Sequence, residues 1–235
     1  MKKHTLLLFD LDGTLLGSEW FKEGIIKTIQ SHALTINIDA DLFLQKKLSV
    51  PLPLLNKFKN REMTPCEFRR ARWKHAFSCF DMYPDQDTVD EFHECFLTKG
   101  MSCIKEDVQL NSIMNELQAH YHLGIVTNAL YDPIKKISCM NLSHVFKKEA
   151  IFQAEELGYR KPDPELYTAA LSHFDASPDQ TIFIGDSWDY DVVAPIKMGM
   201  DAIWLNAGNA SPPTAHKPLE VIREITELRT VLLNN

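Results

Sequence analysis

Two carboxylates stand two residues apart in the segment Asp10-Leu11-Asp12-Gly13. In an extended chain, residues i and i+2 project to the same side, so both acids face one space. Two carboxylates this close do not both ionise cheaply unless a cation lies with them or one of them stays protonated. These are the two arrangements that a nucleophile and a general acid use. Taken alone, the same residue types are equally typical of a surface turn.

A second acidic segment follows another apolar run, because residues 185–191 read Gly-Asp-Ser-Trp-Asp-Tyr-Asp. Magnesium prefers oxygen ligands and typically takes one or two carboxylates, leaving its other positions to water and substrate phosphate. We expect Asp10 and Asp186 to supply those carboxylates. The structural alternative is that Ser187 or Asp189 caps the helix that follows.

Two more polar positions complete the candidate site. Lys161 directly precedes Pro162-Asp163-Pro164, where the prolines restrict the backbone. A fixed cation can neutralise a phosphoryl group and a nucleophile, although an isolated lysine is more often solvated. Thr127 and Asn128 follow an apolar run, where a hydroxyl and backbone amides can hold phosphate oxygens or simply form a turn.

The elements that must position these residues are short apolar runs separated by helical stretches. This alternation predicts β-α-β units and a parallel sheet, whose doubly buried strands are continuously hydrophobic. The fold class is therefore α/β, with a Rossmann-like doubly wound core. Ligands of such sheets bind beyond the carboxyl ends of the strands, which would bring the polar positions together. The predicted strands are Leu6–Phe9, Leu123–Val126, Ala150–Phe152, Thr181–Ile184 and Ala202–Leu205.

The first two runs are separated by far more chain than a crossover helix needs. We expect residues 18–105 to form an inserted helical cap domain, and residues 1–17 and 106–235 to form the catalytic core. Apolar spacing of three to four residues predicts cap helices over Glu19–His32, Pro65–Phe80 and Asp87–Lys99.

Helix-end signals refine these predictions. Thr64 is expected to cap a helix that has Pro65 at its first position. Residues 206–218 are rich in Asn, Ala, Ser and Pro and are predicted to form a loop. A final helix is predicted over Leu219–Leu233.

Composition and charge narrow the class of partner. The formal charge of −7 disfavours a nucleic-acid polymer or an anionic membrane surface and favours a small molecule. The N-terminal apolar run is too short for a signal peptide, and no run is long enough to span a bilayer. Five cysteines without a CxxC pair are typical of reduced thiols. We expect a cytoplasmic protein, either a monomer or a homodimer.

Together, the motifs resemble the haloacid dehalogenase-like hydrolase superfamily, in the order that this family shows. The resemblance spans nearly the whole chain, including the helical insertion after the first motif. Trp204-Leu205-Asn206 and Gly185-Asp186-Ser187-Trp188 resemble the helical-cap subgroup of nucleotidase and phosphoglycolate-phosphatase type. The four motifs are Asp10-Leu11-Asp12-Gly13-Thr14, Thr127-Asn128, Lys161-Pro162, and Gly185-Asp186-Ser187 followed by Asp191.

The resemblance implies a phosphohydrolase that works through an aspartyl-phosphate. Asp10 would attack the phosphoryl group, and Asp12 would protonate the leaving alcohol and later deprotonate the hydrolytic water. Lys161 would be a third catalytic residue and would balance the negative charge of the phosphate. Thr127, Asn128 and Lys161 would bind the phosphate.

The resemblance also implies Mg²⁺ as cofactor. Asp10, Asp186 and the backbone carbonyl of Asp12 would bind the metal, and Asp191 would support the metal or Lys161. The implied substrate is a small phosphomonoester, namely a nucleotide, a sugar phosphate or a phosphoglycolate-like compound.

Three alternative functions compete with this interpretation. Dehalogenases of the superfamily lack the second aspartate of the first motif, so Asp12 argues against that activity. Phosphomutases retain both aspartates, and a regulatory phosphate-binding module would retain the fold, so both remain open. A solvated basic helix face explains most of the charges of the helical insertion as well as substrate selection does. The residues that could select substrate there are Trp20, Lys57, Lys59, Arg61, Arg69, Arg72, Trp73 and Lys74.

Overall fold

The computed structural model describes residues 4–234 of the 235-residue chain. The chain divides into two compact units, which are considered separately. The first unit comprises Met1–Gly17 and Glu106–Asn235, and the second, here called the helical unit, comprises Ser18–Lys105. In the described part of the chain, no helix combines the length and the apolar character needed to cross a membrane.

The first unit is built on a six-stranded sheet with the order β3-β2-β1-β4-β5-β6, and every neighbouring pair is parallel. The five predicted strands are confirmed, each within one residue at either end. The central strand β1 lies between β2 and β4, and each of these pairs with a further strand on its other side. All four residues of β1 are fully buried. The strands are β1 (Leu6–Phe9), β2 (His122–Thr127), β3 (Ile151–Gln153), β4 (Thr181–Gly185), β5 (Asp201–Leu205) and β6 (Glu220–Ile222).

The register of the central strands brings their carboxyl ends to one level. Phe9 lies opposite Ile125 of β2 and Ile184 of β4. The ladder continues one residue further, because the Asp10 amide donates to the Ile184 carbonyl at 2.9 Å. The residues that follow β1, β2 and β4 therefore emerge at the same edge of the sheet.

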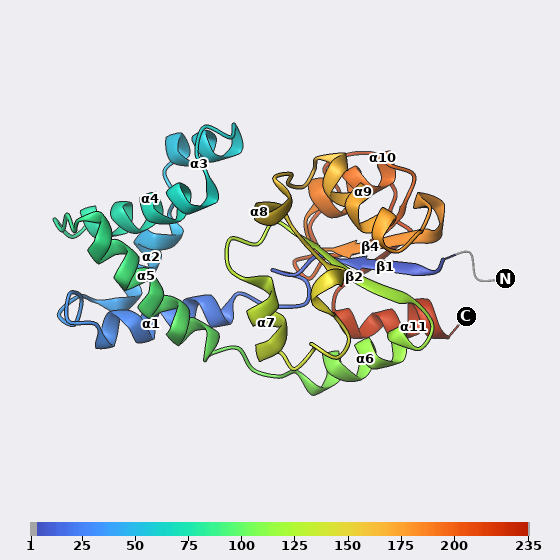
Figure 1. The fold of residues 1–235 in the computed structure, drawn as a ribbon, viewed down its shortest axis with the longest axis horizontal. Coiled ribbons are helices and arrows are strands. Elements are labelled where there is room, and N and C mark those ends of the chain that lie inside the picture. Colours follow the sequence, from blue (N-terminus) through green and yellow to red (C-terminus); the bar gives the residue numbers. More distant parts are fainter. Residues whose placement is uncertain (1–3, 235) are drawn as a thin grey trace. The chain divides into compact units, whose positions relative to one another are not determined.

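Helices cover both faces of this sheet, as Figure 1 shows, with α6 and α11 on one side and α9 and α10 on the other. Buried apolar side chains on α9, including Leu166 and Tyr167, pack with Leu6, Leu8 and Phe183 of the strands. This doubly covered parallel sheet confirms the predicted fold class. The helices of this unit are α6 (Val108–Gln118), α7 (Pro133–Cys139), α8 (Ala154–Leu157), α9 (Pro164–His173), α10 (Ala194–Lys197) and α11 (Leu228–Leu233).

The predicted C-terminal helix over Leu219–Leu233 is wrong in its first half. Residues Glu220–Ile222 form the edge strand β6, and a 3₁₀ turn separates this strand from α11. The ladder with β5 extends to a bond from the Asn206 amide to the Ile222 carbonyl at 2.7 Å. Pairing with an open sheet edge satisfies backbone groups that local sequence preference does not reveal.

The helical unit contains five helices around a core of aromatic side chains. Trp73, Phe77, Phe92 and Phe96 are fully buried, and the Trp73 and Phe92 rings meet edge to face with centroids 5.2 Å apart. The three predicted helices of this segment are present, and two more precede Pro65. Their bounds are α1 (Glu19–Ser31), α2 (Ala40–Leu48), α3 (Leu52–Lys59), α4 (Pro65–Ser78) and α5 (Gln86–Met101).

The start of α4 confirms the predicted cap at Thr64. The Thr64 hydroxyl accepts a hydrogen bond from the Glu67 amide at 3.2 Å, and the Glu67 carboxylate accepts one from the Thr64 amide at 2.7 Å. This reciprocal capping box satisfies two amides that the helix leaves unpaired.

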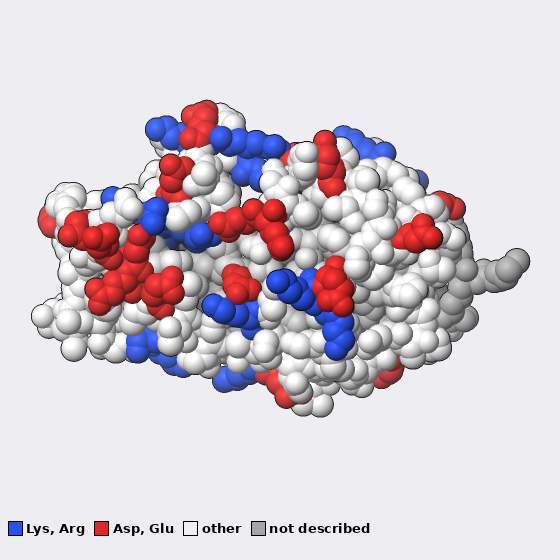
Figure 2. All heavy atoms as spheres, in the orientation of Figure 1, with Lys and Arg blue, Asp and Glu red and all other residues white. Residues whose placement is uncertain are grey.

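Charged side chains of both signs are interspersed over the face of the molecule in Figure 2, which shows no continuous basic surface. This distribution agrees with the acidic net charge of −7. All five cysteines are free thiols, as predicted.

Candidate active site

Asp10 follows β1 and is held against a buried lysine. The Lys161 ammonium donates to Asp10 Oδ1 at 2.7 Å and to Asp191 Oδ1 at 2.8 Å, and only 3% of Lys161 is exposed. Burial alone would lower the pKa of Lys161, but the two carboxylates outweigh it and raise that pKa. The lysine is therefore a permanently charged bridge between two acids that lie far apart in sequence.

Asn128 fixes the backbone from which Lys161 extends. Its side-chain oxygen accepts a bond from the Lys161 amide at 2.8 Å, and its side-chain nitrogen donates to the Lys161 carbonyl at 3.0 Å. This paired contact occupies the Asn128 side chain, which the sequence had suggested for phosphate binding. In this structure, the asparagine side chain holds the backbone of Lys161 in place.

Asp186 follows β4 and approaches the first motif closely. Its amide donates to the Thr14 hydroxyl at 3.1 Å, and this hydroxyl in turn donates to Asp186 Oδ1 at 3.3 Å. Gly13 has a φ of 96°, and a Cβ atom there would lie 2.7 Å from Asp186 Oδ2. A glycine is thus required at this turn for conformation and for space.

The surroundings of Asp186 destabilise the charged form of its carboxylate. Partial desolvation and the negative charge of Asp10 raise the pKa of Asp186, whereas the Thr14 hydroxyl and Lys161 oppose that rise. The charge of Lys161 is already shared by Asp10 and Asp191, so the negative charge at Asp186 is incompletely balanced.

Asp191 lies fully buried in the π-helical segment Trp188–Val193 that follows β4. Besides the bond from Lys161, its Oδ2 accepts one from the Ser187 amide at 2.9 Å. A side chain at Gly185 would collide with this carboxylate. Burial and then Asp10 raise the pKa of Asp191 against the opposing effect of Lys161. Lys161 therefore stabilises the ionised form of Asp191.

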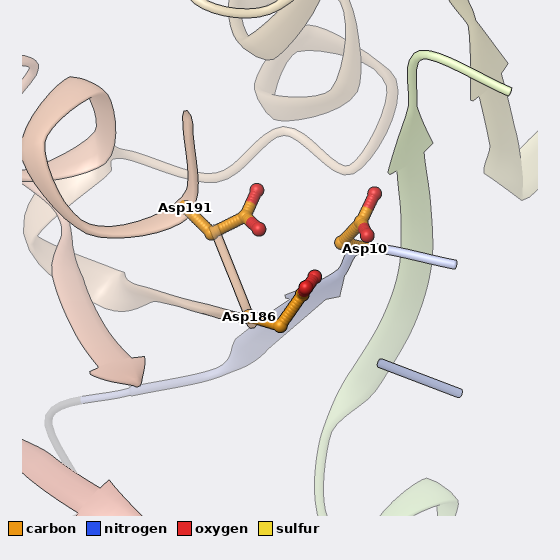
Figure 3. A group of neighbouring side chains, drawn as sticks. All are labelled: Asp10, Asp186 and Asp191. Carbon is orange, nitrogen blue, oxygen red and sulfur yellow. The ribbon is translucent and has the colours of Figure 1, made fainter. Parts of the chain in front are cut away.

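Three of the acids form a group with the chemistry of a hard-cation site. One carboxylate oxygen from each of Asp10, Asp186 and Asp191 lies within 4.8 Å of the others, and Figure 3 shows the three side chains gathered at the strand ends. Mg²⁺ favours such oxygen donors. Because three carboxylates converge here and the Lys161 ammonium pairs with only two of them, the residues present fit a divalent cation.

Asp12 is directed to a different partner. Both of its carboxylate oxygens accept bonds from the Lys136 ammonium of α7, each at 2.7 Å, and the Asp12 side chain is 40% exposed. The Lys136 side chain is 1% exposed. This lysine was missed from the sequence, although Pro133, Lys136 and Ile137 follow the i, i+3, i+4 spacing of one buried helix face.

Thr127 ends β2 and is 1% exposed. Its hydroxyl accepts a bond from the Ala129 amide at 3.1 Å, which tightens the turn after the strand. Trp20 and Trp73, both suggested as substrate-selecting residues, are 5% and 0% exposed and belong to the core of the helical unit.

The chain is similar to known proteins over nearly all of its length. The family described as haloacid dehalogenase-like hydrolase matches residues 7–205. The HAD-hydrolase YfnB of Bacillus subtilis (strain 168) is 26% identical over 234 residues, covering 99% of this chain and 97% of YfnB. The pyrimidine 5'-nucleotidase YjjG of Escherichia coli (strain K12) is 21% identical over 228 residues, covering 96% of each chain.

Solved structures share the fold. Magnesium-bound YfnB from Bacillus subtilis superposes with a TM-score of 0.81 at 22% identity, covering 98% of this chain and 99% of that one. The 2-haloacid dehalogenase of Pseudomonas syringae pv. Tomato DC3000 gives a TM-score of 0.71 at 23% identity, with the same coverage. On the family match over most of its length, the chain belongs to the haloacid dehalogenase-like hydrolases.

Proposed function

We propose that this protein is a magnesium-dependent phosphohydrolase that cleaves a small phosphomonoester through a phosphoryl group carried on Asp10. The observation that supports this most strongly is the pair of acids in the first motif, which have separate partners. Asp10 is bonded to Lys161 beside Asp186, whereas Asp12 is bonded to Lys136. In this proposal the first unit is the catalytic core and the helical unit is the cap.

In the first half-reaction, Asp10 is the nucleophile. Lys161 bonds to Oδ1 of Asp10, so we assign Oδ2 as the attacking oxygen. A bond forms between this oxygen and phosphorus, the ester bond to the leaving oxygen breaks, and Asp12 gives its proton to that oxygen. The products of this step are a free alcohol and an aspartyl-phosphate.

In the second half-reaction, Asp12 takes a proton from water. The water oxygen attacks phosphorus, the bond to Asp10 breaks, and inorganic phosphate leaves with the nucleophile restored. Lys136 holds the Asp12 carboxylate through both oxygens and thereby fixes its direction between the two proton transfers.

Charge compensation comes from the chain and from the metal. Lys161 balances negative charge at the nucleophile, and the hydroxyl of Thr127 at the end of β2 binds phosphoryl oxygens. Asp10, Asp186 and the Asp12 carbonyl would hold Mg²⁺, with Asp191 supporting Lys161. A bound Mg²⁺ supplies positive charge for the phosphoryl oxygens.

The substrate class is inferred from the chain and its relatives together. Asp12 supplies the proton transfers that phosphate esters require, and this favours phosphate chemistry over dehalogenation. The similarity to the nucleotidase YjjG supports nucleotides as candidates, beside sugar phosphates and phosphoglycolate-like compounds.

The test is a panel of these three phosphomonoester classes, assayed for released phosphate with Mg²⁺ and again with EDTA. We expect release from at least one class with Mg²⁺, loss of release with EDTA, and recovery when Mg²⁺ is restored. Transfer of phosphate within a sugar, without release, would identify a mutase instead. Full activity in EDTA would contradict the metal dependence, and inactivity on every class would contradict the proposed hydrolase.

A further inference from the structure

The helical unit holds a buried lysine over the face of a tryptophan ring. Lys47 of α2 is 1% exposed, and its ammonium nitrogen lies 3.6 Å from the centroid of the Trp73 ring. Within residues 4–234, this nitrogen has no hydrogen-bond partner. An unsatisfied amine in a packed interior is costly, and a methionine would fill a similar volume without that cost. Packing alone does not account for the lysine.

A second cationic side chain lies close to it. Arg72 of α4 remains charged at any ordinary pH, and its Nε atom is buried with no hydrogen-bond partner among the described residues. Burial, followed by the charge of Arg72, lowers the pKa of Lys47 well below its usual value. Lys47 Nζ and Arg72 Nε are therefore hydrogen-bond donors without an acceptor among the described residues. The charge of Arg72 also destabilises the protonated form of Lys47.

His93 of α5 is hydrogen-bonded to the same tryptophan. The indole N–H of Trp73 donates to His93 Nδ1 at 3.1 Å. An indole nitrogen only donates, so a neutral His93 carries its proton on Nε2 and is a donor there. Burial, then the charges of Arg69 and Lys47, lower the pKa of His93 to about 4, which makes the neutral form dominant near pH 7.

No carboxylate of the described chain is recorded as an ion-pair partner of Lys47 or Arg72. Asp90, whose charge acts on His93, is already engaged by Arg70 through two bonds of 2.7 Å. Lys47 and Arg72 are thus two neighbouring basic groups that have no acidic hydrogen-bond partner among residues 4–234 at their buried nitrogens. The group that would satisfy these donors and relieve their mutual repulsion is an anion.

We propose that Lys47 and Arg72, beside Trp73, form a binding site for an oxyanion, either a carboxylate or a phosphate group. Arg72 is partly exposed and Lys47 is fully buried, so in this proposal the anion contacts Arg72 on the outer side and Lys47 at the deepest point. Such a group accepts several charge-assisted hydrogen bonds at once. This site lies in the helical unit and does not depend on the proposed phosphohydrolase activity.

The test follows the Trp73 indole N–H by NMR in the full-length protein, with the signal assigned through Trp73→Phe. Inorganic phosphate and malonate are titrated separately, with sodium chloride at matched ionic strength as the reference. We expect phosphate or malonate to shift the Trp73 signal saturably beyond the chloride effect. The more effective anion tells whether the site takes phosphate or carboxylate.

Two variants make the result specific. Lys47→Met removes the buried amine and should weaken anion binding at least about tenfold, the effect of losing one charged hydrogen bond. Lys46→Met removes a neighbouring lysine of the same helix and should leave binding unchanged. Arg72→Gln, at a partly exposed position, should also weaken binding and repeats the test without altering the buried Lys47 position. Absence of a saturable shift with both anions, or equal binding by wild type and both Lys47→Met and Arg72→Gln, would overturn the proposal.

Discussion

Replacing Lys161 with methionine should destabilise the first unit strongly. Lys161 is the buried cation between Asp10 and Asp191, at 2.7 and 2.8 Å. Removing one partner of a buried ion pair typically costs about 3–5 kcal/mol, because the remaining charge is left without compensation. For a chain of this size, that loss corresponds to a lower melting temperature by about 6–20 °C.

The loss should depend on pH in a defined direction. Burial already raises the pKa of Asp191, and removal of Lys161 eliminates an effect that opposes this rise. The folded variant then binds more protons than its unfolded chain, so its stability decreases as pH increases. The destabilisation relative to wild type should therefore be larger at pH 8 than at pH 5.5.

Urea unfolding followed by circular dichroism at both pH values measures this effect. Lys197→Met provides the control, because Lys197 is an exposed lysine of the same unit and its replacement should change stability by less than about 0.5 kcal/mol. A Lys161→Met protein as stable as this control, or one whose loss is greater at pH 5.5, would refute the electrostatic account of the site.

Two further substitutions test the neighbouring contacts. Gly13→Ala should cost about 1–2 kcal/mol of stability, because the residue has a φ of 96°. It should also weaken Mg²⁺ binding in calorimetry, because the added Cβ would press on Asp186. An unchanged Mg²⁺ affinity would contradict this. Lys136→Met should lower kcat about tenfold or more with little change in KM, since it removes the charged bonds that direct Asp12. Steady-state kinetics measures both parameters, with the exposed Lys135→Met as control. A Lys136→Met protein with the same kcat as this control would contradict the directing role of Lys136.

Much of the site could be predicted because its residues follow strand ends. Doubly buried parallel strands are continuous apolar runs, and the polar residue after each run marks the carboxyl edge of the sheet. This logic predicted that Asp10 and Asp186 would meet, and the structure brings their carboxylates together. Lys161 was found through its rigid proline context, and it lies between Asp10 and Asp191.

The remaining features depend on tertiary contacts. Lys135 and Lys136 are adjacent in sequence, yet their side chains are 72% and 1% exposed because only one lies on the inner face of α7. The bonds from Asn128 to the Lys161 backbone join residues of two loops, and no local pattern signals them. The strand Glu220–Ile222 is too short for a periodic signal and is defined by its pairing with β5.

The central claim is that Asp10 carries the phosphoryl group, and direct detection of that adduct tests it. Asp12→Asn should accept phosphate from an aryl phosphate, whose leaving group needs little protonation, but should hydrolyse the product slowly because the base for water is gone. Rapid acid quench, proteolysis and mass spectrometry should then find the phosphoryl group on the Asp10 peptide with Mg²⁺ present, and none in Asp10→Asn. Turnover by Asp10→Asn at the wild-type rate, or phosphate attached to a different residue, would contradict the mechanism.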